Sequence, residues 1–236
     1  MGKNKLARWT EMKSFRNVYE PSADEVYTKD HSLKGSWNSK VFSNINPIIL
    51  ELGCGKGEYT VGLATRYPQK NYIGIDIKGA RMWRGSKTAH EKNILNVAFI
   101  RTRVEFINSF FSEDEIEEIW ITFPDPQPKR KNEFKRLTSP RFLNSYRKFL
   151  KNNGIIHLKT DSKDLYSYTL DLVKSNCLEI IESTDDLYSG LIENDILSIR
   201  THYEKIFLEK GSRICYLSFR INKNKVITND QRQKKQ

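Results

Sequence analysis

The sequence has 236 residues, of which 38% are hydrophobic and 29% are charged, and its 40 Lys and Arg against 29 Asp and Glu give a formal net charge of +11. This length suffices for one sizeable α/β domain with a full core. No apolar run is long enough to span a bilayer, and the basic start has no apolar stretch behind it, which excludes a secretory signal. We therefore expect a cytoplasmic protein that does not contact a membrane.

Cysteine and histidine usage argues against a metal site. The three cysteines lie far apart, no Cys-x-x-Cys pair occurs, and the four histidines are equally scattered. An odd number of cysteines also disfavours a disulfide framework. We therefore expect no bound metal.

The positive charge is concentrated in three segments. Counting side chains, residues 1–20 carry net +3, residues 127–151 net +8 and residues 222–236 net +4, so the rest of the chain is net −4. Solubilising surface charge is a sufficient explanation for either tail alone. The internal segment is the most strongly charged, which favours a polyanionic partner.

The chain divides into three predicted regions. Residues 1–46 are polar and weakly periodic, which predicts a basic arm with loops and room for one short helix. Residues 222–236 predict a basic, disordered tail. In residues 47–221, short runs rich in β-branched residues alternate with stretches of helical period, which is typical of a parallel sheet. The seven expected strands are Ile48–Leu52, Tyr72–Ile75, Val97–Ile100, Ile119–Phe123, Ile155–Leu158, Leu178–Glu182 and Arg213–Ile221.

Helices are expected between these strands. One covers residues 78–90, and another begins after Ser162 and runs through Val173. Between them, Ser139-Pro140 offers a cap and a first-turn proline for a helix whose apolar face continues to Leu150 and which ends at Gly154. The whole pattern predicts a single doubly wound α/β domain of about seven strands.

A glycine-rich turn follows the first predicted strand. The run Glu51-Leu52-Gly53-Cys54-Gly55-Lys56-Gly57 leads from strand to helix, which places a ligand crevice at the carboxyl edge of the sheet. Glycines suit this turn because the backbone must bend sharply and approach the ligand closely. The spacing differs from the G-x-G-x-x-G of dinucleotide-binding proteins, and no phosphate-loop motif is present. The carboxylate of Glu51 would repel a pyrophosphate and suits a cationic ligand that carries an ammonium and a sulfonium.

The second predicted strand ends in another carboxylate, Asp76. An acid at this strand end can accept hydrogen bonds from both hydroxyls of a ribose. Capping of the following helix is the alternative role for Asp76. Together the two strand ends resemble the class I, Rossmann-like core of methyltransferases that use S-adenosylmethionine.

The fourth predicted strand ends in Phe123-Pro124-Asp125-Pro126-Gln127-Pro128, followed by Lys129-Arg130-Lys131. Three prolines in five residues can neither pair in a sheet nor form a helix, so they predict a stiff loop at the ligand edge. Such a loop can hold the carboxylate of Asp125 beside a reacting atom. The alternative is a rigid turn in which Asp125 is only a turn former.

This loop, with Leu158-Lys159-Thr160-Asp161 and Thr201-His202-Tyr203-Glu204, resembles the signature of bacterial tRNA (guanine-N7) methyltransferases. The resemblance covers roughly residues 48–219. It implies S-adenosylmethionine as cofactor, tRNA as partner and a catalytic role for Asp125. We expect a monomer or homodimer. The cofactor contacts that it implies come from Glu51, Gly53, Gly55, Asp76, Thr102 and Asp125. The substrate contacts that it implies come from Lys129, Asp161, Thr201, His202, Tyr203 and Glu204.

The chain departs from the family pattern in three places. Many members have Asp after the third strand, where this chain has Thr102-Arg103. Many have Trp after Phe-Pro-Asp-Pro, where this chain has Gln127, and Lys at the position of His202. The resemblance still implies methyl transfer to N7 of a guanosine, in the variable loop of tRNA.

The residues leave three alternatives open. A methyltransferase for an exocyclic amine is disfavoured because Gln127 follows Asp125-Pro126, where those enzymes carry Pro and an aromatic residue. A non-catalytic RNA-binding subunit is disfavoured because Glu51, Asp76 and Asp125 are all present. A nicotinamide dehydrogenase is disfavoured by the glycine spacing. In the favoured interpretation, Lys129, Arg130, Lys131, Lys135 and Arg136 hold the RNA backbone, and Phe123, Trp83 and Tyr203 are candidates for stacking the base.

Overall fold

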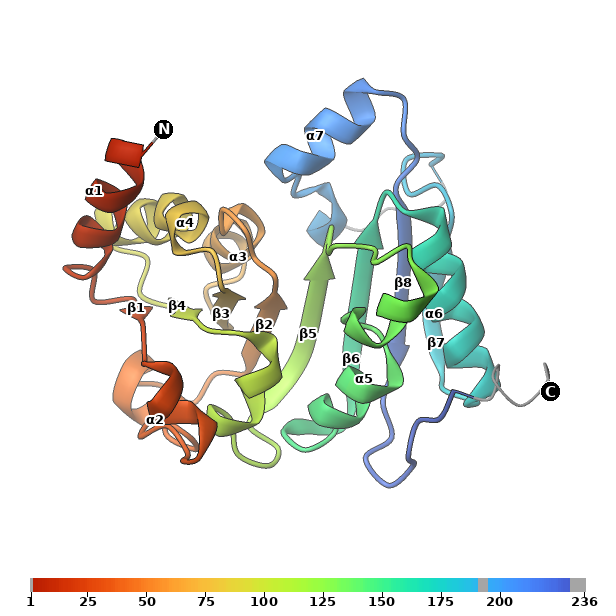
Figure 1. Ribbon diagram of the computed structural model, residues 1–236, viewed down its shortest axis with the longest axis horizontal. Helices are drawn as coiled ribbons and strands as arrows, with labels where there is room; N and C mark the ends of the chain where they lie inside the picture. The colour runs from red at the N-terminus through yellow and green to blue at the C-terminus, as the bar shows by residue number, and fades with distance from the viewer. Residues whose placement is uncertain (1, 191–194, 230–236) are drawn as a thin grey trace.

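One eight-stranded sheet organises the molecule (Figure 1), of which the computed structural model describes residues 2–190 and 195–229. The strands are β1 (Val18–Tyr19), β2 (Ile48–Leu52), β3 (Asn71–Asp76), β4 (Val97–Arg101), β5 (Ile116–Thr122), β6 (Leu150–Thr160), β7 (Ile180–Thr184) and β8 (Cys215–Arg220). Their order is β1-β4-β3-β2-β5-β6-β8-β7. Only β8 pairs antiparallel, with β6 and β7, in the described part of the chain. The prediction of a doubly wound α/β domain is confirmed. The sheet has one strand more than the seven predicted, and this extra strand is β1, at the edge beside β4.

Helices cover both faces of the sheet. They are α1 (Gly2–Met12), α2 (Ala23–Tyr27), α3 (Glu58–Arg66), α4 (Gly79–Glu91), α5 (Pro140–Tyr146), α6 (Lys163–Ser175) and α7 (His202–Glu209). Residues of α3 and α4 pack in one hydrophobic cluster, and those of α2, α5 and α6 pack in the other. Figure 1 shows α7 above the ends of β5 and β6, outside both layers.

Side-chain alternation along the strands explains these two layers. In β4, Val97 and Phe99 join the cluster under α3 and α4, whereas Ala98 and Ile100 join the opposite cluster. Successive side chains of a strand point to opposite faces, and parallel strands with both faces covered are apolar throughout. The nearly continuous apolar runs in the sequence therefore predicted the central strands correctly.

The strand order fixes the place of the ligand crevice. From β2 the chain moves outward through β3 and β4, and then crosses to β5 on the other side of β2. In open α/β sheets, ligands bind at the carboxyl ends of the strands where the order reverses. That point lies between the ends of β2 and β5, where the sequence places the glycine turn and the proline loop.

The predicted helix around Ser139 is shorter than expected. Helix α5 ends at Tyr146, and Leu150, assigned to its apolar face, begins β6 and pairs with Ile116 of β5. Strand pairing is favoured over a longer helix at this position because it buries Leu150 completely. Pro140 does occupy the first turn, but the hydroxyl of Ser139 donates to the carbonyl of Phe134 and forms no cap hydrogen bond. The helix after Ser162 matches its prediction, and that hydroxyl accepts from Leu165 N at 3.2 Å.

The two terminal regions are more ordered than their composition suggested. Residues 1–46 contain α1, α2 and β1, and the buried Trp37 donates from Nε1 to the carbonyl of Phe110 at 2.8 Å. In the C-terminal segment, the Asn144 side chain brackets the backbone of Ile227, which is 2% exposed. The expected disordered tail therefore does not begin at residue 222, and its last residues, 230–236, lie outside the described part of the chain.

Within residues 2–190 and 195–229, no helix combines the length and apolar character needed to cross a membrane. The same residues contain no group of three or more His, Cys, Asp or Glu placed to hold a metal ion.

Candidate active site

The turn after β2 forms the floor of the site. Gly53, Gly55 and Gly57 have φ of 74°, 54° and 68°, conformations that L side chains rarely adopt. Gly57 also lies against Gly85 of α4, where an added Cβ would meet the Lys56 carbonyl oxygen at 2.6 Å. The turn is tied to β3, because the backbone N–H of Gly53 donates to the carbonyl of Ile75 at 2.8 Å.

Glu51 is a buried carboxylate at the end of β2. It is 3% exposed and accepts hydrogen bonds from Thr60 N at 2.9 Å, from the Thr60 hydroxyl and from the Thr122 hydroxyl at 2.5 Å. Burial raises the pKa of Glu51 to about 7, although these hydrogen bonds favour the carboxylate. Among the described residues it forms no ion pair with Lys or Arg, so this carboxylate fits a cationic ligand.

The carboxylate of Asp76 at the end of β3 accepts two backbone hydrogen bonds, and the N-cap of α4 is Lys78 rather than Asp76. One carboxylate oxygen accepts from Gly55 N at 2.9 Å, and the other accepts from Lys78 N at 2.7 Å, ahead of α4. Asp76 also lines the same pocket as Glu51. Thr102, the third expected cofactor contact of this region, donates from its backbone N to the Asp76 carbonyl at 3.2 Å and does not line the pocket.

The proline loop after β5 places Asp125 at the opposite wall of the pocket. Phe123 and Gln127 both have φ of 47°, in the left-handed region, and Phe123 N donates to the Lys159 carbonyl at 2.8 Å. The exposed carboxylate of Asp125 accepts from Gln127 N at 3.0 Å, so Asp125 does form a local turn. It also lines the pocket, which keeps it available to a ligand.

Arg136 stabilises this loop from behind. Its guanidinium donates to the carbonyls of Pro126 and Gln127 at 3.2 and 3.3 Å and lies 4.3 Å from the ring centroid of Tyr168. Arg136 is 8% exposed. The expectation that it contacts RNA is therefore wrong, because its donors already hold the loop. Lys129, Arg130, Lys131 and Lys135 are exposed, as that expectation required.

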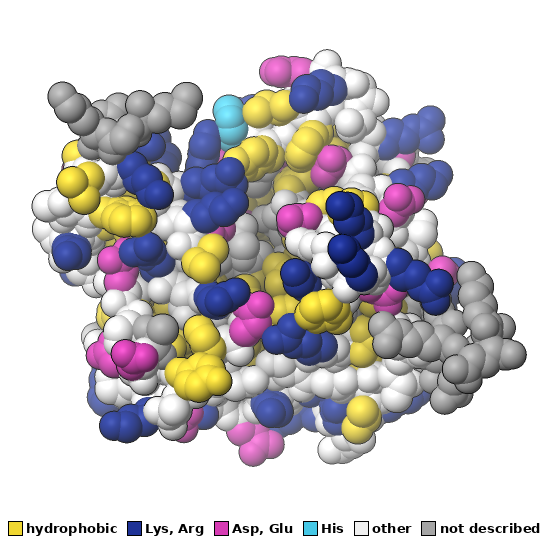
Figure 2. Space-filling model, in the orientation of Figure 1, with side chains coloured by type: hydrophobic (Ala, Val, Ile, Leu, Met, Phe, Trp, Pro, Cys, Tyr) yellow, Lys and Arg dark blue, Asp and Glu magenta, His cyan; other side chains and the backbone are white. Residues whose placement is uncertain are grey.

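These walls enclose a cavity of about 300 Å³ at the switch point of the sheet. Figure 2 shows Lys and Arg side chains over much of the molecular face in the orientation of Figure 1, around a recess near its centre. Of the predicted site residues, the cavity is lined by Glu51, Gly53, Gly55, Asp76, Asp125, Thr201 and Tyr203. The lining does not include Thr102, Lys129, Asp161, His202 or Glu204.

The sequence reasoning missed four charged residues of the lining, Lys56, Glu58, Lys78 and Arg81. Arg81 lies on α4, two residues into the helix, and its guanidinium is 5.6 Å from the ring centroid of Tyr203. A signal was present: the helix that follows Asp76 begins at the ligand edge, so its first turn faces the crevice.

The Thr201–Glu204 motif begins α7 and has two distinct parts. Thr201 accepts from Glu204 N at 3.1 Å, and the Glu204 carboxylate accepts from Thr201 N at 3.4 Å, which forms a capping box. Thr201 and Tyr203 face the pocket. The backbone N–H of His202 donates to Glu58 at 2.7 Å, while its side chain is exposed.

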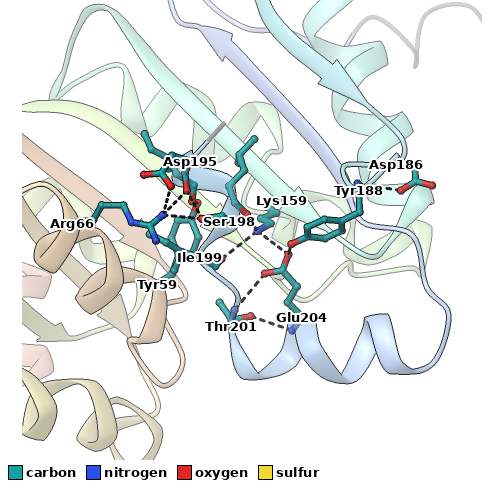
Figure 3. Close-up of polar contacts among 12 residues, drawn as sticks. Tyr59, Arg66, Lys159, Asp186, Tyr188, Asp195, Ser198, Ile199, Thr201 and Glu204 are labelled. Carbon is teal, nitrogen blue, oxygen red and sulfur yellow. Dashed lines mark hydrogen bonds and ion pairs between the residues drawn. The ribbon is translucent and has the colours of Figure 1, made fainter. Parts of the chain in front are cut away.

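Glu204 is fully buried in an ion pair with Lys159 of β6 (Figure 3). The two charged groups are 2.8 Å apart, and Tyr188 donates to the same carboxylate oxygen at 2.5 Å. Lys159 also donates to the carbonyl of Leu197 at 2.9 Å, although burial lowers its pKa. As placed, Glu204 contacts these groups and lies away from the pocket, so it anchors α7 to the sheet. Asp161, one residue beyond β6, is half-buried, and burial raises its pKa.

The chain matches a family model described as a putative methyltransferase over residues 45–217. It is 57% identical to a tRNA (guanine-N(7)-)-methyltransferase of Porphyromonas gingivalis over 79% of this chain and 76% of that protein. It is 49% identical to the enzyme of the same name from Bacteroides fragilis over 93% of this chain and 86% of that one.

The chain belongs to the tRNA (guanine-N(7)-)-methyltransferase family. The identification made from the proline loop and the Thr201–Glu204 motif is thereby confirmed. The fold agrees: a solved 16S rRNA methyltransferase, KamB, superposes with a TM-score of 0.59 at 11% identity, covering 78% of this chain and 92% of that one. For a member of this methyltransferase family, the cavity at the switch point is the candidate active site.

Proposed function

We propose that this chain transfers a methyl group from S-adenosylmethionine to N7 of a guanosine in tRNA. The observation that carries the proposal is that the carboxylates of Glu51, Asp76 and Asp125 line one cavity at the topological switch point. The family membership of the chain supports the same reaction.

The residues of the cavity fit S-adenosylmethionine. Glu51 offers a buried carboxylate without a cationic partner among the described residues, which suits the ammonium or sulfonium of this cofactor. Asp76 is oriented by two backbone N–H groups and suits the ribose hydroxyls. When bound, the cofactor supplies an electrophilic methyl group on a positively charged sulfur.

The chemistry requires positioning and no general base. N7 of guanine carries a free lone pair and no proton, and it lies on the major-groove edge as an acceptor. Alignment of well-oriented reactants contributes on the order of 7–11 kcal/mol. The guanine becomes positively charged as N7 is methylated, so the carboxylate of Asp125 at the pocket wall stabilises the developing charge or holds the donor edge of the base.

The RNA is held by basic side chains at the edge of the cavity and beyond it. Lys129, Arg130 and Lys131 are exposed directly beyond the proline loop, and Lys135 lines the pocket. Their contacts to phosphate position the RNA without reading its sequence. We place the target guanosine in the variable loop, the reaction in the cytoplasm, and the enzyme in a monomeric or homodimeric form.

Incubation with methyl-labelled cofactor and unmodified tRNA, followed by nucleoside analysis, tests the proposal. We expect label in 7-methylguanosine alone. Label in a nucleoside with a methylated exocyclic amine would replace the target assignment. Absence of label together with absence of cofactor binding in calorimetry would indicate a non-catalytic RNA-binding subunit.

A further inference from the structure

A second hollow adjoins the active-site cavity on the side of α1 and α4. It has a volume of about 410 Å³ and is lined by Arg8, Lys56, Glu58, Ala80, Arg81, Trp83 and Arg84. Lys56, Glu58 and Arg81 also line the active-site cavity, so the two spaces share a wall. Four of the seven lining residues are cationic and one is acidic.

The hollow has a fixed geometry because α1 is held on α4. Glu11 of α1 pairs with Lys87 at 2.7 Å and accepts from the indole N–H of Trp83 at 2.6 Å. These contacts place the Trp83 ring between the two helices. The guanidinium of Arg8 lies 4.6 Å from the Trp83 ring centroid, and that of Arg84 lies 5.9 Å away.

The cations of this hollow are not neutralised within the described residues. The guanidinium groups of Arg8, Arg81 and Arg84 form no ion pair or hydrogen bond there, whereas neighbouring Lys87 is paired with Glu11 and Glu91. The one acid, Glu58, accepts from His202 N at 2.7 Å. A guanidinium stacked on an aromatic ring keeps its edge N–H donors available, and these donors match the geometry of phosphate oxygens.

We propose that this hollow binds a backbone phosphate of the substrate RNA, close to the nucleotide whose base occupies the active-site cavity. The strand then crosses the cavity from Arg8 and Arg84 on one side to Lys129 and Lys131 on the other. This inference rests on the proposed function, because it assigns the path of the same substrate.

The charge and position of the hollow favour RNA over a free anion. A free phosphate ion would occupy the hollow alone, whereas exposed basic residues continue beyond the proline loop at Lys129, Arg130 and Lys131, as a polyanionic strand requires. Contacts of this kind release counterions, so they give a measurable salt dependence: log K falls by about 0.7–0.9 per phosphate for each unit of log salt.

The experiment measures binding of an unmodified tRNA transcript to the full chain at several salt concentrations. We expect the double variant R8A/R84A to raise the Kd for tRNA on the order of tenfold at 0.15 M salt and to lower the salt slope by about one to two. Calorimetry with S-adenosylmethionine should give the wild-type affinity, because neither arginine lines the cofactor cavity. A wild-type melting temperature checks the fold, and the charge-retaining variant R8K/R84K should recover part of the slope.

Lys92→Ala is the matched control. Lys92 is an exposed cation at the opposite end of α4, and we expect it to leave the tRNA affinity and salt slope unchanged. Unchanged affinity and slope for tRNA in R8A/R84A would overturn the inference. A variant that binds tRNA as the wild type does, and loses only the ability of inorganic phosphate to compete with tRNA, would also overturn it. Wild-type protein that binds tRNA but forms no 7-methylguanosine would instead overturn the proposed function. The tRNA affinities and salt slopes of R8A/R84A and the wild type could still be compared in that case.

Discussion

The two walls of the active-site cavity are built by different means. The donor wall, which we propose to hold the methyl donor, consists of Glu51, Gly53, Gly55 and Asp76. It is fixed by backbone N–H groups and by the glycine turn. The acceptor wall, which we propose to face the methyl-accepting guanine, consists of the proline loop at residues 123–128 and the start of α7 at Thr201 and Tyr203. It depends on side chains from distant segments, chiefly Arg136 and the Lys159–Glu204 pair.

Because of this difference, we expect the two walls to be sensitive to different changes. The donor wall buries a carboxylate whose charge depends on pH, so pH should affect it first. The acceptor wall exposes Asp125 and relies on a buried ion pair, so loss of one distant partner should affect it first.

The largest expected effect is at the anchor of the acceptor wall. Lys159→Met leaves the fully buried carboxylate of Glu204 without its cation and should lower the free energy of unfolding by about 3–5 kcal/mol. Urea denaturation measures it. The control Lys163→Met breaks the exposed Lys163–Asp185 pair and should change the free energy of unfolding by no more than about 1 kcal/mol. Equal losses in both variants would show that the buried pair is not a special anchor.

Asp125 tests the chemistry of the same wall. We expect Asp125→Ala to lower kcat on the order of 100-fold, because the carboxylate no longer stabilises the charge that develops on guanine. The melting temperature should stay near that of the wild type, since Asp125 is exposed and the hydrogen bond that it accepts from Gln127 N is local. Single-turnover kinetics with saturating cofactor and tRNA measure the step. A kcat within threefold of wild type would assign Asp125 to the turn alone.

The donor wall predicts a pH effect on cofactor binding. Because burial raises the pKa of Glu51 to about 7, the free protein holds a proton there at lower pH, and a cationic ligand must displace it. The Kd should therefore rise about tenfold per pH unit below 7 and level off above it. In Glu51→Gln this dependence should disappear. Calorimetry across pH 5.5–8.5 measures it.

The chemical step should behave differently from binding. At saturating cofactor and tRNA, kcat should change little near neutrality, because N7 needs no base to remove a proton. A kcat profile with a base pKa between 6 and 8 under these conditions would contradict the mechanism.

The smallest expected effect belongs to the exposed basic segment. Lys131→Ala should weaken binding equally for all tRNAs and lower the salt slope by about one. Filter binding at three salt concentrations measures both quantities. If neither changes, Lys131 is a solvated surface charge.

The sequence predicted the donor wall better than the acceptor wall for a physical reason. Glu51, the glycine turn and Asp76 follow from strand ends and glycine positions, which are local signals. The burial of Glu204 against Lys159 joins residues 45 positions apart, and the burial of Arg136 follows from how the proline loop folds back. No local pattern distinguishes a lysine that binds RNA from one that binds a buried carboxylate.

The same limit applies to the fold. Apolar runs predicted the central strands, whereas Leu150 changed from helix to strand because its partner Ile116 lies in another segment. Residues 1–46 gave a weak pattern because their anchors, such as Trp37, are single aromatic residues without periodicity.

The wall shared by the active-site cavity and the hollow beside α1 makes occupancy of one space matter to the other. Lys56 and Arg81 face both, so a ligand that fixes their side chains on one side changes the freedom left to them on the other. Thermodynamic linkage requires this influence to be equal in both directions. Cooperative loading of methyl donor and nucleic acid, and coupled release of their products, would follow from the side chains that both spaces share.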